Sequence, residues 1–157
     1  MKKTNAMRLL DKEKIDYRVS QYPVDESDLS AVHAAEALGA DIKQVYKTLV
    51  LQGKSGGYMV ACIQGDAAID LKKLAKIAGE KNVEMIKQKD LQGLTGYMRG
   101  GVSPLGMKKK YPTFLDETMF LQTEIYFSAG ERGKQIILAP ELLKKMVDGV
   151  SGDIQED

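Results

Sequence analysis

The sequence contains very few of the residues from which proteins build nucleophilic or metal-dependent active sites. Among its 157 residues there is one cysteine, Cys62, and one histidine, His33. A Cys–His or Ser–His pair needs a histidine base, and His33 lies in an alanine-rich segment typical of a structural helix. One Cys and one His cannot complete a tetrahedral zinc site, and no carboxylate set has calcium-loop spacing. The sequence therefore predicts no metal and no cofactor, and it disfavours a protein nucleophile.

The single cysteine also excludes an internal disulfide, which suits the reducing cytoplasm. It lies in the apolar segment YMVACIQ, where a free cysteine usually behaves as a small buried hydrophobic residue. No apolar run approaches the ~20 residues of a membrane span, and the N-terminal MKKTNAMRLLDKEKID lacks the apolar core of a secretory signal. We therefore expect a cytoplasmic protein with no membrane association.

The chain has no charge excess of either sign, because its formal net charge is only +1. Any affinity for nucleic acid must then come from a local basic patch. The length fits one domain, which we assign to residues 1–150. A polar C-terminal tail, residues 151–157, should follow, and the segment GVSGDIQED that contains it is expected to be frayed.

The hydrophobic pattern alternates between helical and strand periods along the chain. Helical patterns cover residues 5–15, 31–39, 69–80, 87–96 and 140–148. Strand patterns cover residues 17–22, 45–52, 58–64, 83–86, 113–117, 124–130 and 134–140. The turn GKSGG predicts a hairpin between the second and third strands, which breaks any simple parallel winding. An α+β fold with a mixed sheet is the economical interpretation.

One loop, TGYMRGGVSPLGMKKKYP at residues 95–112, combines backbone freedom with positive charge and contains no carboxylate. Gly100 and Gly101 can adopt φ > 0 and leave their N–H groups free for a ligand oxygen, and Pro104 stiffens the far side of the turn. Free N–H groups are what an oxyanion or an ester carbonyl requires. The alternative is a plain turn, since G-x-x-x-P is a short motif.

Lysines form the second group of candidates. Lys47 interrupts the apolar segment VYKTLVLQ, so it either lies on a solvated face or is held in a cleft to meet an anion. Lys108, Lys109 and Lys110 directly follow the glycine-proline loop. They form either an ordinary charge run or a set of phosphate contacts.

The segments VYKTL, IDLKKLAK, TGYMRGGVSPLGMKK and SAGERG together resemble the YbaK/EbsC family in order and spacing. The resemblance extends from about Ala6 to about Val147. It implies a mixed, partly barrel-like sheet surrounded by helices. It also implies an aminoacyl-tRNA deacylase related to the editing domain of prolyl-tRNA synthetase. Such an enzyme removes a wrong amino acid, most typically from Cys-tRNA(Pro), after the synthetase has released the tRNA (trans-editing). The implied partners are aminoacyl-tRNA and, transiently, prolyl-tRNA synthetase.

The same resemblance implies roles for individual residues. Lys47 corresponds to the family's essential lysine, a point charge that anchors a phosphate or polar group near the 3′ terminal adenosine. Gly100, Gly101 and Pro104 match the loop that holds the aminoacyl ester with backbone donors. The expected substrate-binding set is Tyr22, Tyr46, Arg99, Ser103, Ser128 and Gln135. Lys108, Lys109 and Lys110 are expected to contact tRNA phosphates.

Gln135 departs from the pattern, because the cysteinyl deacylase branch has aspartate at this position. An amide carries no charge, although it donates and accepts hydrogen bonds. The substitution places the chain nearer the EbsC-like branch and leaves its substrate preference open.

Three functions are compatible with these residues. In the first, the thiol of a cysteinyl ester attacks its own carbonyl, so that the protein only positions the substrate and the reaction is lyase-like. In the second, a general deacylase uses water or a ribose hydroxyl, and accepts Ala-tRNA(Pro). In the third, a non-catalytic module binds tRNA or a synthetase. Dependence of the rate on the substrate thiol distinguishes the first two.

Overall fold

The computed structural model describes residues 2–157, which form five α-helices, three short 3-10 helices and eight strands. The α-helices are α1 (Asn5–Lys12), α2 (Ala31–Leu38), α3 (Leu71–Ala78), α4 (Leu91–Thr95) and α5 (Pro140–Val147). The strands are β1 (Arg18–Gln21), β2 (Tyr46–Gly53), β3 (Tyr58–Gln64), β4 (Val83–Met85), β5 (Thr113–Asp116), β6 (Ile125–Ser128), β7 (Lys134–Leu138) and β8 (Val150–Gly152). The 3-10 helices are η1 (Ile42–Gln44), η2 (Gln88–Asp90) and η3 (Glu117–Leu121).

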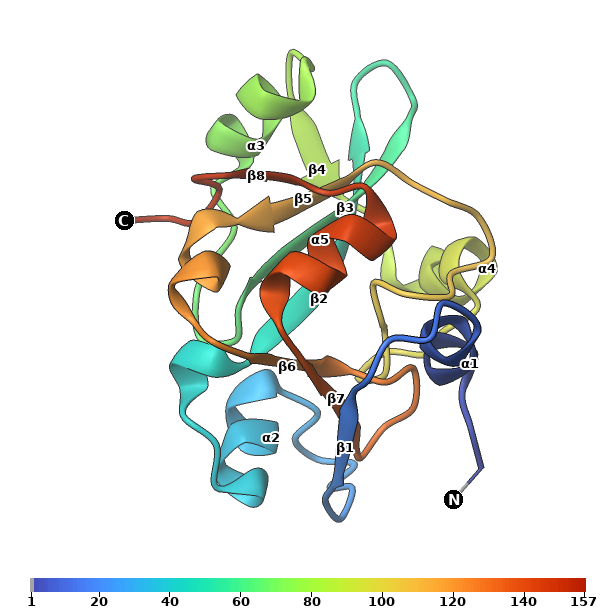
Figure 1. Cartoon of the computed structure of the whole chain (residues 1–157). Coiled ribbons are helices and arrows are strands. Elements are labelled where there is room, and N and C mark those ends of the chain that lie inside the picture. The colour runs from blue at the N-terminus through green and yellow to red at the C-terminus, as the bar shows by residue number, and fades with distance from the viewer. Residues whose placement is uncertain (1) are drawn as a thin grey trace.

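The strands form two sheets (Figure 1). The larger sheet has the order β4-β2-β3-β5-β8, with antiparallel pairs at β2–β4 and β2–β3 and parallel pairs at β3–β5 and β5–β8. The smaller sheet, β1-β7-β6, is antiparallel, and a parallel bridge between Val45 and Tyr126 joins the two sheets at one corner. The predicted single-domain α+β fold with a mixed sheet is confirmed, but the sheets do not close into a barrel.

Capping residues define both ends of α2 and α3. In α3, the Asp70 carboxylate accepts hydrogen bonds from the Lys72 and Lys73 amides, and Gly79 ends the helix in the left-handed conformation at φ +72°. In α2, Ser30 and Gly39 play the same two roles. These caps fix the direction in which the chain enters and leaves each short helix.

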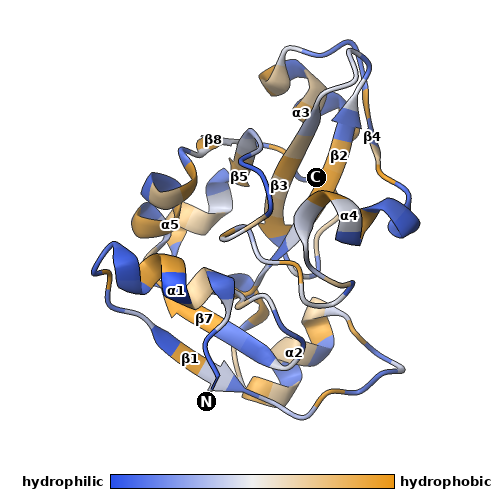
Figure 2. Cartoon of the chain, turned by 90° about the vertical axis from the view of Figure 1, so that its right-hand side faces the viewer, coloured by the Kyte–Doolittle hydropathy of each residue, from blue (hydrophilic) through white to orange (hydrophobic). Residues whose placement is uncertain are grey.

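The central strand β3 is buried on both faces, which explains why its sequence is almost continuously apolar. Val60 and Cys62 belong to one hydrophobic cluster, which also contains residues of α1, α5 and the smaller sheet. Met59, Ala61 and Ile63 point the other way, into a cluster with α3. Hydrophobic colour accordingly runs along β3 in Figure 2. The core therefore holds the two sheets together at β2 and β3.

The C-terminal segment is ordered, so the expectation of a frayed tail was wrong. Residues Val150–Gly152 form β8, which adds a parallel edge strand to β5. Ile154 is fully buried, and its amide donates to the Asp116 carboxylate at 3.0 Å. The Gln155 side chain accepts a hydrogen bond from the Gln64 amide at 2.7 Å. This mostly polar segment is therefore held in place by the backbone pairing of β8 with β5 and by the buried Ile154.

Asp116 should be a strong determinant of stability, because its buried carboxylate accepts three hydrogen bonds. These come from the Ile154 amide, the Thr118 amide and the Thr118 hydroxyl. We expect Asp116→Ala to lower the free energy of unfolding by about 2–4 kcal/mol, since it leaves buried donors unpaired. Urea denaturation would measure this. Asp116→Asn keeps one acceptor and should cost less, and an unchanged stability in Asp116→Ala would contradict the prediction.

Candidate active site

A cavity of about 450 Å³ lies where the two sheets meet. Its walls come from the segment between β1 and α2, from the first half of β2, from the glycine-proline loop, and from β6 and β7. The cavity brings together seven of the residues predicted from the sequence: Tyr22, Tyr46, Lys47, Arg99, Gly100, Ser128 and Gln135. A size of this order suits a small ligand or the end of a larger one.

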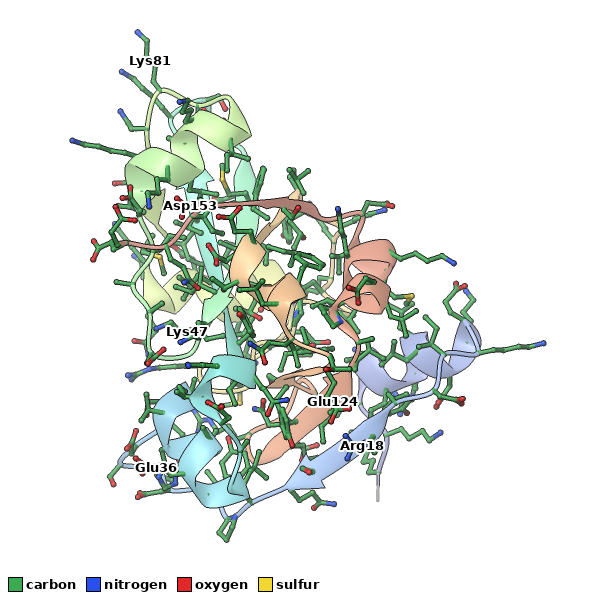
Figure 3. The ribbon with its side chains drawn as sticks, turned by 60° about the vertical axis from the view of Figure 1, so that its left-hand side comes forward. Arg18, Glu36, Lys47, Lys81, Glu124 and Asp153 are labelled. Carbon is green, nitrogen blue, oxygen red and sulfur yellow. The ribbon has the colours of Figure 1, made fainter. Side chains whose placement is uncertain are left out.

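Lys47 lies on β2 opposite Ile63 and extends into the cavity, half-buried. Burial lowers the pKa of its ammonium below the ordinary lysine value, and the nearby Asp66 carboxylate opposes that shift. Within residues 2–157 it forms no ion pair. Figure 3 shows it near α2, well away from the exposed Lys81. Of the two interpretations of Lys47, the cleft is therefore the one that the structure supports.

Two residues of the glycine-proline loop line the cavity and have N–H groups without a hydrogen-bond partner among the described residues. Gly100 lines the cavity at φ +83°, and its N–H has no hydrogen-bond partner among the described residues. Gly101 behaves differently, because its N–H donates to the Met98 carbonyl at 2.9 Å and it does not line the cavity. The expectation of two free glycine N–H groups is therefore wrong for Gly101, whose N–H closes the turn. Val102 lines the cavity instead, and its N–H has no partner within residues 2–157.

Arg132 fixes this loop, although the sequence indicated no role for it beyond the SAGERG motif. Its Nε donates to the Arg99 carbonyl at 2.7 Å, and its guanidinium pairs with Glu26 at 2.9 Å. Three segments that border the cavity are tied together in this way. A Cβ added at Gly101 would lie 3.1 Å from the Arg132 backbone nitrogen, so a larger residue there would push the two segments slightly apart. The two glycines therefore differ: Gly100 has a free N–H, and Gly101 allows a close contact with the Arg132 backbone.

The structure does not bring Ser103 and Pro104 into the cavity. Ser103 is fully buried, and its hydroxyl oxygen accepts a hydrogen bond from the Leu105 amide at 3.2 Å. The Tyr97 hydroxyl donates to the Leu105 carbonyl at 2.5 Å, which fixes the same turn from the other side. Pro104 faces a separate cavity of about 330 Å³ between the loop, α1 and α5. Both residues therefore shape the loop from behind.

The three consecutive lysines also lie outside the first cavity, and all are exposed. Lys110 pairs with Asp148, the Lys108 side chain lies over Gly96, and Lys109 borders the second cavity. Their contact with tRNA phosphates stays a prediction.

Gln135 is the most unusual polar group of the cavity. It lies on β7 between Ser20 of β1 and Ser128 of β6, and only 7% of it is exposed. Its Oε1 is buried without a hydrogen-bond partner among the described residues. Buried polar atoms are almost always paired, so the unpaired Oε1 makes Gln135 an exception within this wall of the cavity.

The two tyrosines of the cavity are positioned by neighbours. Tyr46 is 3% exposed, and its hydroxyl lies 2.8 Å from the Thr118 hydroxyl, which itself donates to Asp116. Burial raises the pKa of Tyr46. Tyr22 makes an edge-to-face contact with His33 at 6.4 Å between ring centroids. The only histidine thus supports a cavity residue and does not line the cavity itself.

Cys62 is buried, and burial raises the pKa of its thiol to about 12. We expect Cys62→Ala to keep the activity of the protein within about twofold, while costing about 1 kcal/mol of stability through the lost core contact. A thiol reagent should leave native Cys62 unmodified and react after denaturation. A large activity loss in a folded Cys62→Ala variant would contradict the assignment to the core.

The described residues contain no group of three or more His, Cys, Asp or Glu side chains that could hold a metal ion. Within residues 2–157, no helix has the length and apolar character needed to cross a bilayer.

Comparison with known proteins identifies the class to which this fold and cavity belong. It is the class of proteins that edit aminoacyl-tRNA. The family model for the aminoacyl-tRNA editing domain matches residues 26–146, which include every residue that lines the cavity except Tyr22. The chain belongs to this family, and the resemblance seen in the sequence is confirmed.

Individual relatives give the same result. EbsC of Enterococcus faecalis, provisionally named a Cys-tRNA(Pro)/Cys-tRNA(Cys) deacylase, is 47% identical over 152 residues, which are 97% of this chain and 93% of that protein. The multifunctional Ser/Thr-tRNA deacylase ProXp-y of Escherichia coli is 28% identical over 134 residues, 83% of this chain and 78% of that one. A crystal structure described as a provisional trans-editing enzyme for prolyl-tRNA synthetase superposes with a TM-score of 0.86 at 25% identity, covering 98% of this chain and 96% of that one.

Proposed function

We propose that this protein is a trans-editing deacylase that cleaves the ester of a mischarged aminoacyl-tRNA, with Cys-tRNA(Pro) as the main substrate. The observation that carries the proposal is that Lys47 and Gly100, whose N–H has no partner among the described residues, line the same cavity of a chain 47% identical to EbsC. One group supplies positive charge and the other supplies a neutral hydrogen-bond donor. Together they match the needs of an ester attached to a phosphate-bearing nucleotide.

The size of the cavity decides which part of the substrate enters it. A volume of about 450 Å³ accommodates an aminoacyl group and part of the terminal adenosine, but not the body of a tRNA. Arg99 is exposed at this site, whereas Lys47 is half-buried. We therefore place the tRNA backbone at Arg99 and the ester between Lys47 and the glycine-proline loop.

The chemistry then follows from the groups present. The N–H groups of Gly100 and Val102 stabilise negative charge that develops on the ester carbonyl oxygen. Water attacks the carbonyl carbon, the bond to the ribose oxygen breaks, and that oxygen takes up the proton that the water loses, leaving a free ribose hydroxyl and a free amino acid. With a cysteinyl ester, the substrate sulfur can form the new bond instead, giving a thiolactone and the same free ribose hydroxyl. Orientation alone contributes about 7–11 kcal/mol in favourable intramolecular cases, so a protein nucleophile is not needed.

Prolyl-tRNA synthetase is the proposed partner, since the similar crystal structure is described as a trans-editing enzyme for that synthetase. A net charge of +1 gives little general attraction for tRNA, so the synthetase would contribute to selecting the tRNA. Aminoacyl-tRNA is made in the cytoplasm, where we place the reaction.

The proposal is tested by deacylation of tRNA(Pro) carrying cysteine, alanine or serine, with the same tRNA body in each assay. Rapid loss of the cysteinyl ester alone would support substrate-thiol assistance. Loss of several esters would establish a general deacylase. If no ester is lost while tRNA still binds, the protein is a binding module and the proposed activity is wrong.

A further inference from the structure

The charge around the mouth of the cavity carries an inference about how a tRNA lies on the protein, and this inference rests on the proposed deacylase function. We propose that the tRNA body leaves the cavity over η2 and α4, where the exposed Lys87 and Lys89 contact its phosphates. Neither lysine was among the residues predicted from the sequence, and neither lines the cavity. They hold the part of the substrate that is too large to enter.

Two stretches of chain that border the cavity have opposite charges. Residues 85–112 contain six lysines and arginines and one carboxylate, which gives a formal net charge of +5. Residues 19–42 contain five carboxylates and no lysine or arginine, which gives −5 with the histidine neutral. The net charge of the whole chain, +1, hides this separation. An RNA body next to the cavity is therefore attracted to the first stretch and repelled by the second.

The fold places the basic stretch, residues 85–112, beside the cavity. The Ile86 amide donates to the Val50 carbonyl at 3.3 Å, so this stretch leaves β2 about 10 Å along the strand from Lys47. From there η2 and α4 lead to the glycine-proline loop, where Arg99 lines the cavity. Figure 1 and Figure 2 both show α4 higher and α2, which belongs to the acidic stretch, lower. The two stretches therefore extend from the cavity in different directions.

The basic stretch has few partners of its own to neutralise it. Of its six basic residues, only Lys110 forms an ion pair within residues 2–157, with Asp148. Lys87 and Lys89 lie on either side of Gln88 and are exposed. Their charges are therefore available to phosphates outside the cavity.

Hydrogen bonds hold the basic stretch in a fixed arrangement. The Tyr111 hydroxyl donates to the Leu94 carbonyl at 2.7 Å, and the Lys108 amide donates to the Thr95 carbonyl at 3.1 Å. Both bonds join α4 to the chain that follows the glycine-proline loop. A surface fixed in this way loses little freedom when a ligand binds.

Binding of uncharged tRNA(Pro) at several salt concentrations tests this surface without requiring ester cleavage. Lys87→Gln/Lys89→Gln should weaken binding about tenfold at low salt. It should also reduce the slope of log K against log salt concentration by about two, one for each lost phosphate contact. Lys72→Gln/Lys76→Gln is the matched control, because it removes two exposed lysines of α3 that also form no ion pair within residues 2–157. Its affinity and slope should match those of the wild type.

A short substrate separates docking from chemistry. Lys87→Gln/Lys89→Gln should lose about tenfold in kcat/KM with aminoacyl-tRNA(Pro). With the same amino acid on a CCA trinucleotide, which has no tRNA body, it should stay within about twofold of the wild type. Glu36→Gln removes one exposed charge from the acidic stretch and should strengthen tRNA binding about twofold.

Several outcomes would overturn the inference. Unchanged tRNA affinity in Lys87→Gln/Lys89→Gln would do so, as would an equal loss in the α3 control, which would indicate a general effect of charge. Weaker tRNA binding by Glu36→Gln would place the RNA on the acidic side. If Lys87→Gln/Lys89→Gln bound tRNA normally but lost affinity for prolyl-tRNA synthetase, the surface would bind a protein and its assignment to RNA would be wrong. Failure of the proposed function is distinct, because the wild-type protein would then hydrolyse no ester, whatever its affinity for tRNA.

Discussion

Replacing Lys47 with alanine is expected to lower kcat/KM for the preferred aminoacyl ester by about 100- to 1000-fold. Lys47 is the only ammonium among the residues that line the cavity, and it has no ion-pair partner within residues 2–157, so its charge is available to the substrate. Partial burial reduces screening by water and strengthens its interaction with a phosphate or a developing oxyanion. Single-turnover deacylation with excess enzyme would measure the effect.

Lys81→Ala is the matched control, because it removes an exposed lysine far from the cavity (Figure 3). We expect its kcat/KM to stay within about twofold of wild type, since an isolated surface charge contributes little. If Lys47→Ala and Lys81→Ala had the same activity, a role for Lys47 in the reaction would be untenable.

The stability of a Lys47 variant should change in the opposite direction from its activity. Burial lowers the pKa of Lys47 in the folded state, so the unfolded chain binds this proton more tightly. Between the folded and unfolded pKa values the unfolded state carries more protons. The free energy of unfolding of the wild type should therefore increase as the pH rises through that range. At a pH below both pKa values Lys47 is protonated in the folded and in the unfolded state, so the folded state bears the full free-energy cost of burying the charge. Lys47→Met should therefore be at least as stable as wild type at pH 7, and should lack this pH-dependent gain.

Local sequence signals were sufficient for the elements that are stabilised by their own residues. The helices predicted over residues 31–39 and 69–80 and the GKSGG hairpin are all present, because each depends on contacts between near neighbours: Ser30 and Gly39 cap α2, and Asp70 and Gly79 cap α3. The C-terminal segment was misjudged for the same reason. Its order depends on pairing with β5 and on a hydrogen bond to Asp116, 38 residues away in sequence.

The cavity shows the same division between local and distant information. Lys47 and Gly100, both chosen from motifs, line the same cavity, but no sequence pattern distinguishes a free backbone N–H from one that closes a turn. Gly101 was therefore expected to have a free N–H that it does not have, and Val102, which lines the cavity, was not among the predicted residues. Arg132 was missed because its role is to join segments that are distant in sequence, through Arg99 and Glu26. Only the fold brings these groups together.

Gly100→Ala should reduce kcat/KM by about 100-fold, because the change distorts the loop that carries the free N–H groups. At φ +83° an L-residue is strained, at a cost of about 1–2 kcal/mol. The added Cβ would also lie 3.1 Å from the Leu29 Cβ and 3.4 Å from the Arg132 Nε. Relieving these contacts takes a shift of a few tenths of an ångström, and relieving the backbone strain at φ +83° moves the loop further. A displacement that reaches about 1 Å costs about 100-fold in rate.

Gly79→Ala is the control variant, because it introduces the same backbone strain at a position outside the cavity. Gly79 ends α3 at φ +72°, and an added Cβ would meet nothing within 4 Å, so the variant has the same backbone strain without a collision. Gly79→Ala should lose about 1–2 kcal/mol in urea denaturation and Gly100→Ala at least as much, but only Gly100→Ala should lose activity. If the two variants retained equal activity at equal stability, the geometry of the loop would not matter to the reaction. The free N–H groups of Gly100 and Val102 would then have to be abandoned as the donors to the ester carbonyl.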